Sequence, residues 1–358
     1  MSARRRGGFV LVAVLFFVLL LTVGVATFQK RAVMDAMIAR NRESSARADA
    51  LARGGIQVGI ALLLEDRLRE AGGELALEGP NDVWAVVGRA ELPIDERSSV
   101  SVSVSDLGSQ LNLNAVINAR RGGSGDDPGG RDAGEDQDKA RSYLIALLEK
   151  AIEDLTAELE LAPGEQSYDP SELADNLIDF ADEDSVRQNG GDEDAWYQEQ
   201  DPPYRAANRP FVSLEELRLV EGIDARLASQ LERYLTVHPF AGTRGINVNT
   251  APAHVLALLY RLDGSDYRLV GEDTVKQILD NRAEGRLICG AAGSGDGGCV
   301  ALNSIPGLQN EPFPAPSYST SYFQLTTTAR VGDVTRQVEA VVDRSDPLEP
   351  ALLSFESR

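Results

Sequence analysis

The chain has 358 residues, of which 56 are acidic and 35 are basic, so its formal net charge is -21 at pH 7. This length leaves room for two domains in addition to a membrane anchor. The acidic balance argues against a nucleic-acid-binding protein, because binding to phosphates requires a basic face.

The first apolar segment runs from Phe9 to Phe28 without a charged residue. At about 1.5 Å of rise per residue, a helix over this segment spans about 30 Å, the thickness of the hydrocarbon core of a bilayer. A single segment in lipid must satisfy its own backbone groups, which predicts a transmembrane helix. A plain signal anchor is one interpretation. A cleaved secretory signal fits less well, because its apolar core is shorter and small residues follow it.

A short basic leader precedes this segment and ends in Gly7 and Gly8. The arrangement resembles a type IV prepilin leader, which a membrane peptidase cuts after the glycine on the cytoplasmic side. The resemblance implies a leader over residues 1–8, a cut between Gly8 and Phe9, and methylation of the new N-terminus. Most pilins and pseudopilins carry a glutamate where this chain has Ala13. Its absence is typical of the K-type minor pseudopilin of type II secretion.

Apolar residues continue at helical spacing from Met34 to Leu68, and charged residues occupy another face of the expected helix. We therefore expect one long helix from Phe9 to about Ala71, ended by the glycine pair 72–73. Its soluble part needs a sheet to cover its apolar stripe.

Strand patterns follow the helix. Val83–Val87 predicts a short strand, Ser98–Ser105 alternates apolar and polar residues, and Leu111–Asn114 continues the alternation. Near the C-terminus, Phe323–Val331 and Thr335–Val342 predict a hairpin. We expect this hairpin to complete the sheet that the first strands begin.

The predicted fold class is α+β, with a pilin-like long N-terminal helix packed on an antiparallel sheet and a large all-helical domain inserted between strands. The expected units are 1–8 as leader, 9–28 as transmembrane part, 29–117 as pilin-like helix and first strands, 118–318 as inserted domain, 319–344 as C-terminal strands, and 345–358 as tail. The inserted domain opens with a flexible loop over 118–138, rich in glycine and aspartate. Its acids could bind cations, but a solvated linker is the simpler interpretation.

Several amphipathic segments of the insertion predict helices. They are Lys139–Leu161, Ser171–Phe180, Ser213–Val220, Asp224–Leu235, a segment that begins at Ala251, and Glu272–Arg282. The expected N-caps are Asp169 or Ser171 for the second helix, Ser213 in a capping box with Glu216 for the third, and Thr250 for the fifth.

Carboxylates are dense at the end of the second helix and in the loop after it. They are Asp179, Asp182 and Asp184, followed by Glu193 and Asp194. Clusters of oxygen ligands suit calcium, and a bound cation would relieve the repulsion between like charges. The EF-hand pattern is not met. From these residues alone, a calcium site and a solvated acidic loop are equally good interpretations.

The order of motifs around this cluster is more specific. The runs are Leu177–Asp184, Gly190–Tyr197, Pro202–Asn208, Ser213–Val220 and Gly245–Pro252. This series resembles the signature of the general secretion pathway protein K family, the minor pseudopilin K of type II secretion. The resemblance implies a helical domain inserted in a pilin fold and a structural calcium site. The ligands carried over by position are Asp179, Asp182, Asp184, Glu193 and Asp194.

Ser213–Ile223 together with Ile246–Ala251 also resembles helix-hairpin-helix pieces of DNA-binding proteins. The acidic neighbours Glu215, Glu216 and Glu221 would repel phosphate. We therefore expect a structural unit for partner contact, and no nucleic-acid partner.

Cys289 and Cys299 flank a glycine-rich loop. A disulfide that closes this loop would contribute about 2–3 kcal/mol. Free thiols are the alternative, and the absence of paired CxxC motifs argues against zinc. His238 and His254 have no nucleophile motif beside them, and no carboxylate is set apart as a general acid. We therefore expect no catalytic residues and no enzyme activity.

The resemblance implies a minor pseudopilin in the tip complex that supports export of folded proteins across the outer membrane. Its expected partners are the I- and J-type minor pseudopilins, the prepilin peptidase and the bacterial inner membrane, crossed once, with the soluble part in the periplasm. The alternative is a membrane-anchored periplasmic binding protein or enzyme with a helical substrate domain. An anchored DNA-uptake protein is a second alternative.

Overall fold

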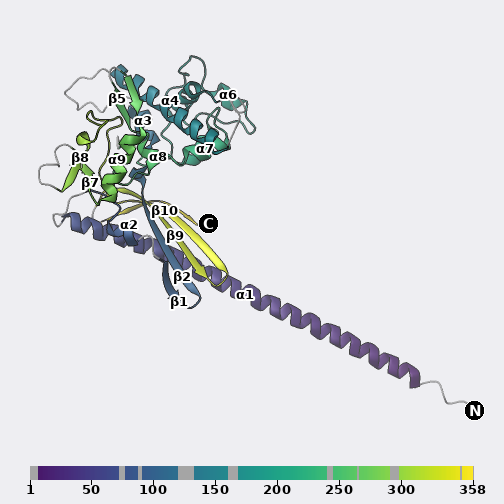
Figure 1. Cartoon of the computed structure of the whole chain (residues 1–358). Helices are drawn as coiled ribbons and strands as arrows, with labels where there is room; N and C mark the ends of the chain where they lie inside the picture. The colour runs from purple at the N-terminus through teal and green to yellow at the C-terminus, as the bar shows by residue number, and fades with distance from the viewer. Residues whose placement is uncertain are drawn as a thin grey trace, which may run out of the picture.

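The computed structural model describes residues 7–71, 77–87, 91–119, 133–159, 168–239, 245–263, 266–290, 298–346 and 349–357. Most of the expected leader, the glycine pair 72–73 and residues 120–132 of the expected flexible loop lie outside these ranges. A long N-terminal helix lies along an antiparallel sheet, and a mainly helical domain sits at one end of that sheet (Figure 1). The predicted plan of a long helix, a sheet and an inserted helical domain is confirmed.

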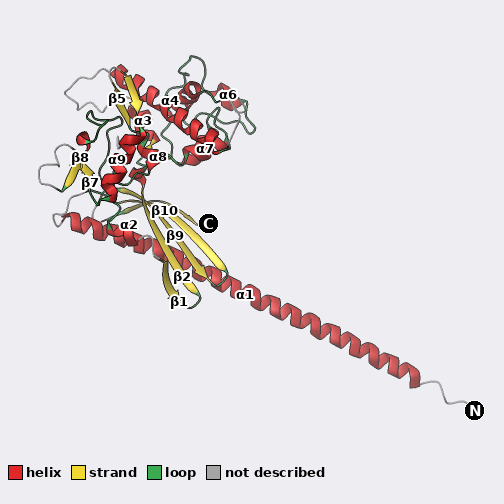
Figure 2. Cartoon of the chain, viewed as in Figure 1, coloured by secondary structure: helices red, strands yellow, loops and turns green. Residues whose placement is uncertain are grey.

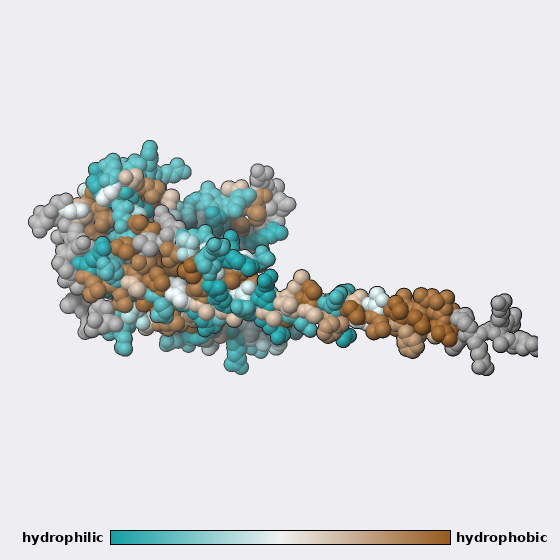
Figure 3. Space-filling view, turned by 90° about the horizontal axis from the view of Figure 1, so that it is seen from below, coloured by the Kyte–Doolittle hydropathy of each residue, from teal (hydrophilic) through white to brown (hydrophobic). Residues whose placement is uncertain are grey.

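Helix α1 (Gly7–Ala71) changes its surroundings along its 65 residues. Its first part is apolar and extends away from the folded body, where Figure 3 shows a brown band near the end of the rod. This part makes α1 a candidate membrane span by length and composition. Its last part buries Ala52, Ile56 and Leu63 against the sheet, because residues three and four positions apart share one helix face.

The sheet has the strand order β1–β2–β9–β10–β11, and each pair of neighbours is antiparallel. The strand bounds are Glu91–Asp95, Ser98–Asp106, Tyr322–Val331, Val334–Asp343 and Ala351–Ser357. Strand β2 pairs with β9 from Ser98 opposite Val331 to Asp106 opposite Phe323, so the chain between them forms the insertion. Alternate residues of β2, β9 and β10 close a core with α1, because successive side chains of a strand point to opposite faces.

Two predictions for this unit are wrong. Val83–Val87 is the short helix α2 rather than a strand. Its apolar run is too short to distinguish the two structures, and the helix buries Trp84 against Phe323 with ring centroids 5.2 Å apart. Ala351–Ser357, expected within a tail, is the edge strand β11. Its pairing with β10 is a tertiary contact that the sequence of the segment alone does not predict.

Close packing of α1 on the sheet depends on glycine. A Cβ atom at Gly55 would lie 2.3 Å from Thr327 Cγ2, and one at Gly59 would lie 2.4 Å from Leu325 Cδ2. At Gly54 such an atom would meet nothing within 4 Å. The conformational cost of Gly55 and Gly59 in a helix is therefore offset by direct contact between helix and sheet.

The inserted domain has its own core, to which helix α4 (Ala133–Glu158) contributes the fully buried Tyr143, Leu144, Leu147 and Leu148. The other helical elements are η1 (Leu107–Ser109), α3 (Leu113–Ala119), α5 (Pro170–Ala181), α6 (Asp194–Gln198), η2 (Leu214–Leu219), α7 (Ala225–Leu231), α8 (Ala253–Leu256), α9 (Glu272–Ala283) and η4 (Leu302–Ser304). Of the expected helices, Ser171–Phe180 matches α5 and Glu272–Arg282 matches α9, each within two residues at either end.

The inserted domain is not all-helical, which corrects the sequence-based prediction. Figure 2 shows short strands among its helices. These strands are β3 (Leu111–Asn112), β4 (Leu235–Thr236), β5 (Tyr260–Asp263), β6 (Asp266–Leu269), β7 (Leu287–Cys289) and β8 (Cys299–Ala301). The pairs β3–β4 and β7–β8 are parallel, and β5–β6 is antiparallel. Each pair joins segments that are too short to show a strand period.

Several element ends also differ from the prediction. Helix α7 was expected to reach Leu235 but ends at Leu231. Leu235 instead belongs to β4, where it pairs with Leu111 of β3. The strand expected over Leu111–Asn114 becomes helix α3 from Leu113. Thr250 does not cap α8, whose N-cap is Pro252.

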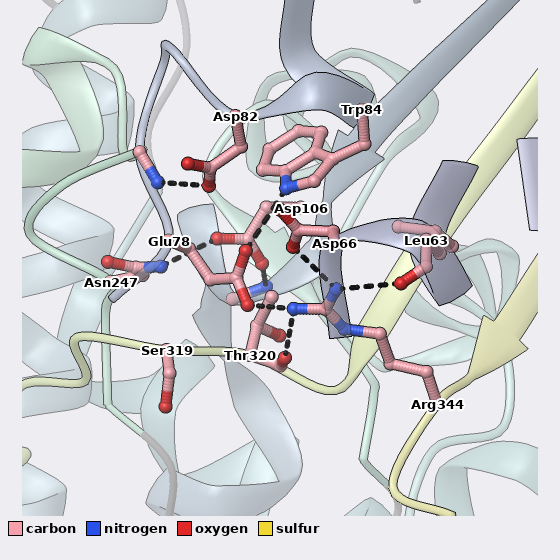
Figure 4. A network of polar contacts seen from close by, with 12 residues as sticks. Leu63, Asp66, Glu78, Asp82, Trp84, Asp106, Asn247, Ser319, Thr320 and Arg344 are labelled. Carbon is pink, nitrogen blue, oxygen red and sulfur yellow. Dashed lines mark hydrogen bonds and ion pairs between the residues drawn. The ribbon is translucent and has the colours of Figure 1, made fainter. Parts of the chain in front are cut away.

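A buried polar network joins α1 to the C-terminal end of the sheet (Figure 4). Arg344, directly after β10, is fully buried and forms ion pairs with Asp66 (2.8 Å) and with Glu78. It also donates to the carbonyl oxygen of Leu63 (3.3 Å), and Trp84 Nε1 donates to Glu78 (3.1 Å). The cation therefore neutralises two carboxylates that burial alone would destabilise.

The same region ties β2 to the inserted domain through Asp106. This carboxylate accepts hydrogen bonds from Asn247 Nδ2 (2.8 Å), the Thr250 hydroxyl (2.5 Å) and the Gly108 amide (2.6 Å). Burial raises the pKa of Asp106, and these hydrogen bonds oppose the rise. The Thr250 hydroxyl thus donates to Asp106, far away in the sequence, and does not cap α8.

The two cysteines are joined by a disulfide between the end of β7 and the start of β8. The Cα atoms of Cys289 and Cys299 lie 5.9 Å apart. The bond links the two strands of the parallel pair β7–β8.

Candidate metal centre

Helix α5 carries the first half of the acidic cluster. Asp169 caps it by accepting hydrogen bonds from the amides of Ser171 and Glu172, so one of the two predicted caps is observed. Pro170 occupies the first turn, where its missing N–H costs nothing. The helix ends at Ala181, so Asp179 lies in its last turn and Asp182 is its C-cap.

A tight turn returns the chain to this helix end. Val186 and Asp192 form an isolated antiparallel bridge, and Gly190 and Gly191 between them have φ values of 82° and 113°. Such backbone angles favour glycine, which has no Cβ atom to clash. The turn therefore delivers Glu193 to the carboxylates of α5.

Three of the predicted ligands meet. Asp179, Asp182 and Glu193 each offer a carboxylate oxygen, and these atoms lie within 4.8 Å of one another. Asp179 is 5% exposed and Glu193 is 1% exposed. Asp179 also accepts a hydrogen bond from the amide of Gln188 (3.1 Å), which fixes the loop against the helix.

Glu193 is the most unfavourably placed of the three. Neither of its carboxylate oxygens has a hydrogen-bond partner in the described part of the chain, although the side chain is buried. Burial, together with the charges of the nearby carboxylates of Asp182, Asp179, Asp184 and Asp194, raises the pKa of Glu193 to about 8. A nearby cation would stabilise the ionised form of a buried acid that is surrounded by other acids.

The other two predicted ligands stand beside this group and have structural partners. Asp184 accepts from the amide of Val186 (2.9 Å). Asp194 accepts from the amide of Ala206 (3.1 Å) and lies 3.6 Å from Arg205 Nε. Both still act on Glu193 through their charge.

Asn208 is a candidate that the sequence-based prediction missed. It has a positive φ of 46°, its amide donates to the carbonyl of Phe180, and its Nδ2 donates to the carbonyl of Asp184 (2.7 Å). Its Oδ1 is buried without a hydrogen-bond partner in the described residues. The only signal was its place in the run Pro202–Asn208, which does not reveal a free amide oxygen beside the acidic loop.

These oxygens fit a hard divalent cation. Calcium takes about 6–8 oxygen ligands in flexible geometry, supplied by carboxylates, amide carbonyls and water. The three clustered carboxylates would hold it, and Asn208 belongs to a segment that is hydrogen-bonded to the acidic loop. The second group of three acids, Asp66, Glu78 and Asp82, contains Arg344 as its cation and does not need a metal.

The comparisons with known proteins agree with this architecture. The family model described as type II secretion system (T2SS), protein K matches residues 109–240. Type II secretion system protein K of Aeromonas hydrophila is 28% identical over 350 residues, which cover 96% of this chain and 94% of the relative. The protein K of Klebsiella pneumoniae is 28% identical over 288 residues, which cover 79% of this chain and 77% of the relative.

A solved structure has the same fold. A chain in the crystal structure of the GspK–GspI–GspJ complex from the type 2 secretion system of enterotoxigenic Escherichia coli matches with a TM-score of 0.58 and 20% identity. The match covers 89% of this chain and 99% of that chain. In sequence the chain is similar to these type II secretion system K proteins, and in fold it is similar to the solved chain.

Proposed function

We propose that the chain is a minor pseudopilin of a type II secretion system that joins I- and J-type minor pseudopilins at the tip of the pseudopilus. In this role it supports the export of folded proteins across the outer membrane. The names of its relatives and the composition of the similar crystal complex support this assignment.

The observation that carries the proposal is the division of α1. The side chains from Val10 to Ile38 are largely exposed and rich in large apolar residues, whereas Ala48, Ala52 and Ile56 are buried against the rest of the chain. Exposed apolar surface of this extent needs lipid or another helix to cover it. A helix of this kind suits a subunit that is first held in a bilayer and then bundled with similar helices.

The remaining features set its place in that assembly. Ala13 means that the apolar helix carries no buried carboxylate that needs a neighbouring amine. The bulky inserted domain suits the end of a fibre better than its shaft. The disulfide fits an oxidising compartment, so we place the soluble part in the periplasm and the single span in the bacterial inner membrane.

Mass spectrometry of the protein isolated from membranes tests the first step. We expect a chain that begins at a methylated Phe9, because prepilin peptidase removes residues 1–8. A Gly8→Leu variant should keep its leader. An intact leader in the unaltered protein would favour a plain anchored binding protein or enzyme.

Purification of the full chain in detergent with I- and J-type minor pseudopilins tests the assembly. We expect one stable complex that elutes ahead of each component. A double variant, Phe17→Asp with Val18→Asp, should assemble poorly, because buried charge in the apolar helix is costly. A chain that stays monomeric with both partners would contradict the proposal.

We also propose that calcium occupies the cluster of Asp179, Asp182 and Glu193, with Asn208 as a further oxygen ligand. The buried, partnerless carboxylate of Glu193 supports this proposal most strongly. Bound calcium would neutralise the cluster and lock the 182–194 loop to the end of α5. The role is structural, because the loop also contacts the neighbouring segment through Asp194 and Asn208.

Thermal unfolding with calcium, with magnesium and with chelator tests the metal proposal. A ligand that binds only the native state must raise the melting temperature. We expect calcium to raise it and magnesium to do so much less, because magnesium demands octahedral geometry and sheds water reluctantly. Identical melting in calcium and chelator would exclude the site.

A further inference from the structure

The two edges of the five-stranded sheet differ in how they are protected. Edge strands expose unpaired backbone groups, and natural proteins blunt them with proline, charged residues, bulges or a covering segment. Strand β1 at one edge has Pro93, the charged residues Glu91 and Asp95, and an irregular register between Pro93 and Asp95. Asp95 is also tied to α1 by an ion pair with Arg47.

Strand β11 at the other edge lacks most of these devices. Its sequence from Ala351 to Ser357 contains no proline and no basic residue, and Glu356 is its one charge. All seven residues are exposed, and β11 pairs with β10 alone among the described strands. Its register shifts at Leu353, but residues 354–357 pair regularly with 341–338. In Figure 1 this end of the chain lies beside β10 at the margin of the sheet.

A groove runs beside this open edge. It has a volume of about 730 Å³ and lies between the sheet and the inserted domain. The sheet contributes Glu339, Val341 and residues 353–356, and the domain contributes residues 212–215 and Arg218. Val212 is 50% exposed and Leu353 is 41% exposed, so apolar surface faces the groove from both sides.

The register of β10 and β11 decides which side chains face the domain. Val338, Ala340 and Val342 belong to the core beneath α1. Their neighbour Glu339 therefore points to the opposite face, and Glu356 lies directly across from it on β11. A strand added beside β11 would place alternate side chains next to Glu356, within reach of the groove.

We infer that the β11 edge is a docking site for an extended segment of another protein, added as a further antiparallel or parallel strand, with apolar and basic side chains in alternation. Backbone hydrogen bonds to β11 supply the affinity in this mode of recognition, and side chains that enter the groove supply the selectivity. The inference is independent of the calcium site and of the leader.

Charge decides between possible occupants. Glu215, Glu339 and Glu356 line the groove, while Arg218 is already paired with Glu232 at 3.2 Å. A basic strand is attracted to this surface. A second copy of the chain would bring the same open edge with the same carboxylates and another net charge of -21, which disfavours self-pairing.

Hydrogen exchange of the full chain in detergent tests the inference with a synthetic probe peptide. The peptide alternates lysine and valine over about seven residues, the length of a usual strand. We expect it to protect the amides of residues 351–357 and to leave those of 91–95 unchanged. A peptide with glutamate in place of lysine should bind weakly, because it meets the acidic groove with like charge.

Two matched controls separate strand addition from simple charge attraction. The same lysine peptide with alternate backbone amides methylated keeps its charge but loses about three hydrogen bonds, and should bind at least about tenfold more weakly. Glu356→Lys should weaken binding of the unmodified peptide about fivefold, because an attractive cross-strand pair becomes a repulsive one. Glu91→Lys on the opposite edge should leave binding unchanged.

Three results would overturn the inference. The methylated peptide binds as well as its parent, the protection appears at residues 91–95 instead, or protection of 351–357 appears without peptide and grows with protein concentration. The last result would assign the edge to a second copy of the chain.

Discussion

Two clusters of three carboxylates, one in each unit of the chain, solve the same electrostatic problem in different ways. Asp66, Glu78 and Asp82 gather near Arg344, directly after β10, and Asp179, Asp182 and Glu193 gather at the end of α5. In the first cluster the buried Arg344 supplies the opposing charge. In the second, the charges that act most on Glu193 are other carboxylates.

The difference shows how each unit is stabilised. In the pilin-like unit the cation is Arg344 of the chain itself, so the contact between α1 and the end of the sheet needs no ion from solution. The inserted domain gathers acids around a partnerless glutamate, so we expect its acidic loop to depend on a cation from solution. Three predictions test this contrast, and a fourth tests the packing of α1 on the sheet.

The largest effect is expected when the internal cation is removed. Arg344→Met leaves Asp66 and Glu78 buried without their partner, and should lower the free energy of unfolding by about 3–5 kcal/mol. Urea unfolding at neutral pH measures the loss. Arg336→Met, at an exposed position of β10, is the matched control and should stay within about 0.5 kcal/mol of the parent. Equal effects of both substitutions would show that Arg344 does not hold the junction.

Removal of the external cation should have the next largest effect, and only on the second cluster. At free calcium about 100-fold above its dissociation constant, the gain over chelator is about 2.7 kcal/mol. Glu193→Gln should abolish most of this gain, whereas the exposed Glu199→Gln should retain it. Arg344→Met should be less stable and still respond to calcium. A calcium response that survives Glu193→Gln would place the metal elsewhere.

The pH dependence in chelator should reveal the raised pKa of Glu193. Its folded value of about 8 lies above the ordinary value of 4.5, so the folded state holds a proton that the unfolded chain releases. This contribution is complete below the ordinary pKa and is lost as the pH rises toward about 8. Urea unfolding of the parent and of Glu193→Gln should therefore differ most in slope across this window. Parallel pH profiles would refute the assignment.

The smallest effects concern neighbouring glycines of α1. Gly55→Ala drives a methyl group into the buried, stiff side chain of Thr327 and should destabilise by about 1 kcal/mol after its gain in helix propensity. Gly54→Ala meets open space and should stabilise by about 0.5–1 kcal/mol. Melting temperatures of the two variants should move in opposite directions. A shift of the same sign would mean that α1 does not pack closely at this point.

The sequence determined the long helix and the central strands of the sheet. An uninterrupted apolar segment followed by a helical stripe predicts α1, and the alternating valines between Ser98 and Ser105 predict β2. These patterns are long and periodic, so local physics is enough to reveal them. The acidic cluster was also visible, because its residues are close in sequence.

Only the tertiary structure decided which acids meet. The turn at Gly190 and Gly191 brings Glu193 to α5, while Asp184 and Asp194 are engaged by backbone amides. Asn208 joins the loop through the carbonyl of Asp184, a contact that no spacing rule predicts. The same holds for Arg344. Arginine is usually exposed, but this side chain is fully buried because it pairs with Asp66, which is far away in the sequence.

Short elements were decided in the same way. Val83–Val87 became a helix because Trp84 packs on Phe323, and Ala351–Ser357 became a strand because β10 offered an open edge. Periodicity specifies an element when its own length supplies enough turns or alternations. Where an element is too short, or a charge needs a distant partner, the free energy that selects the structure comes from contacts that form only when the chain has folded.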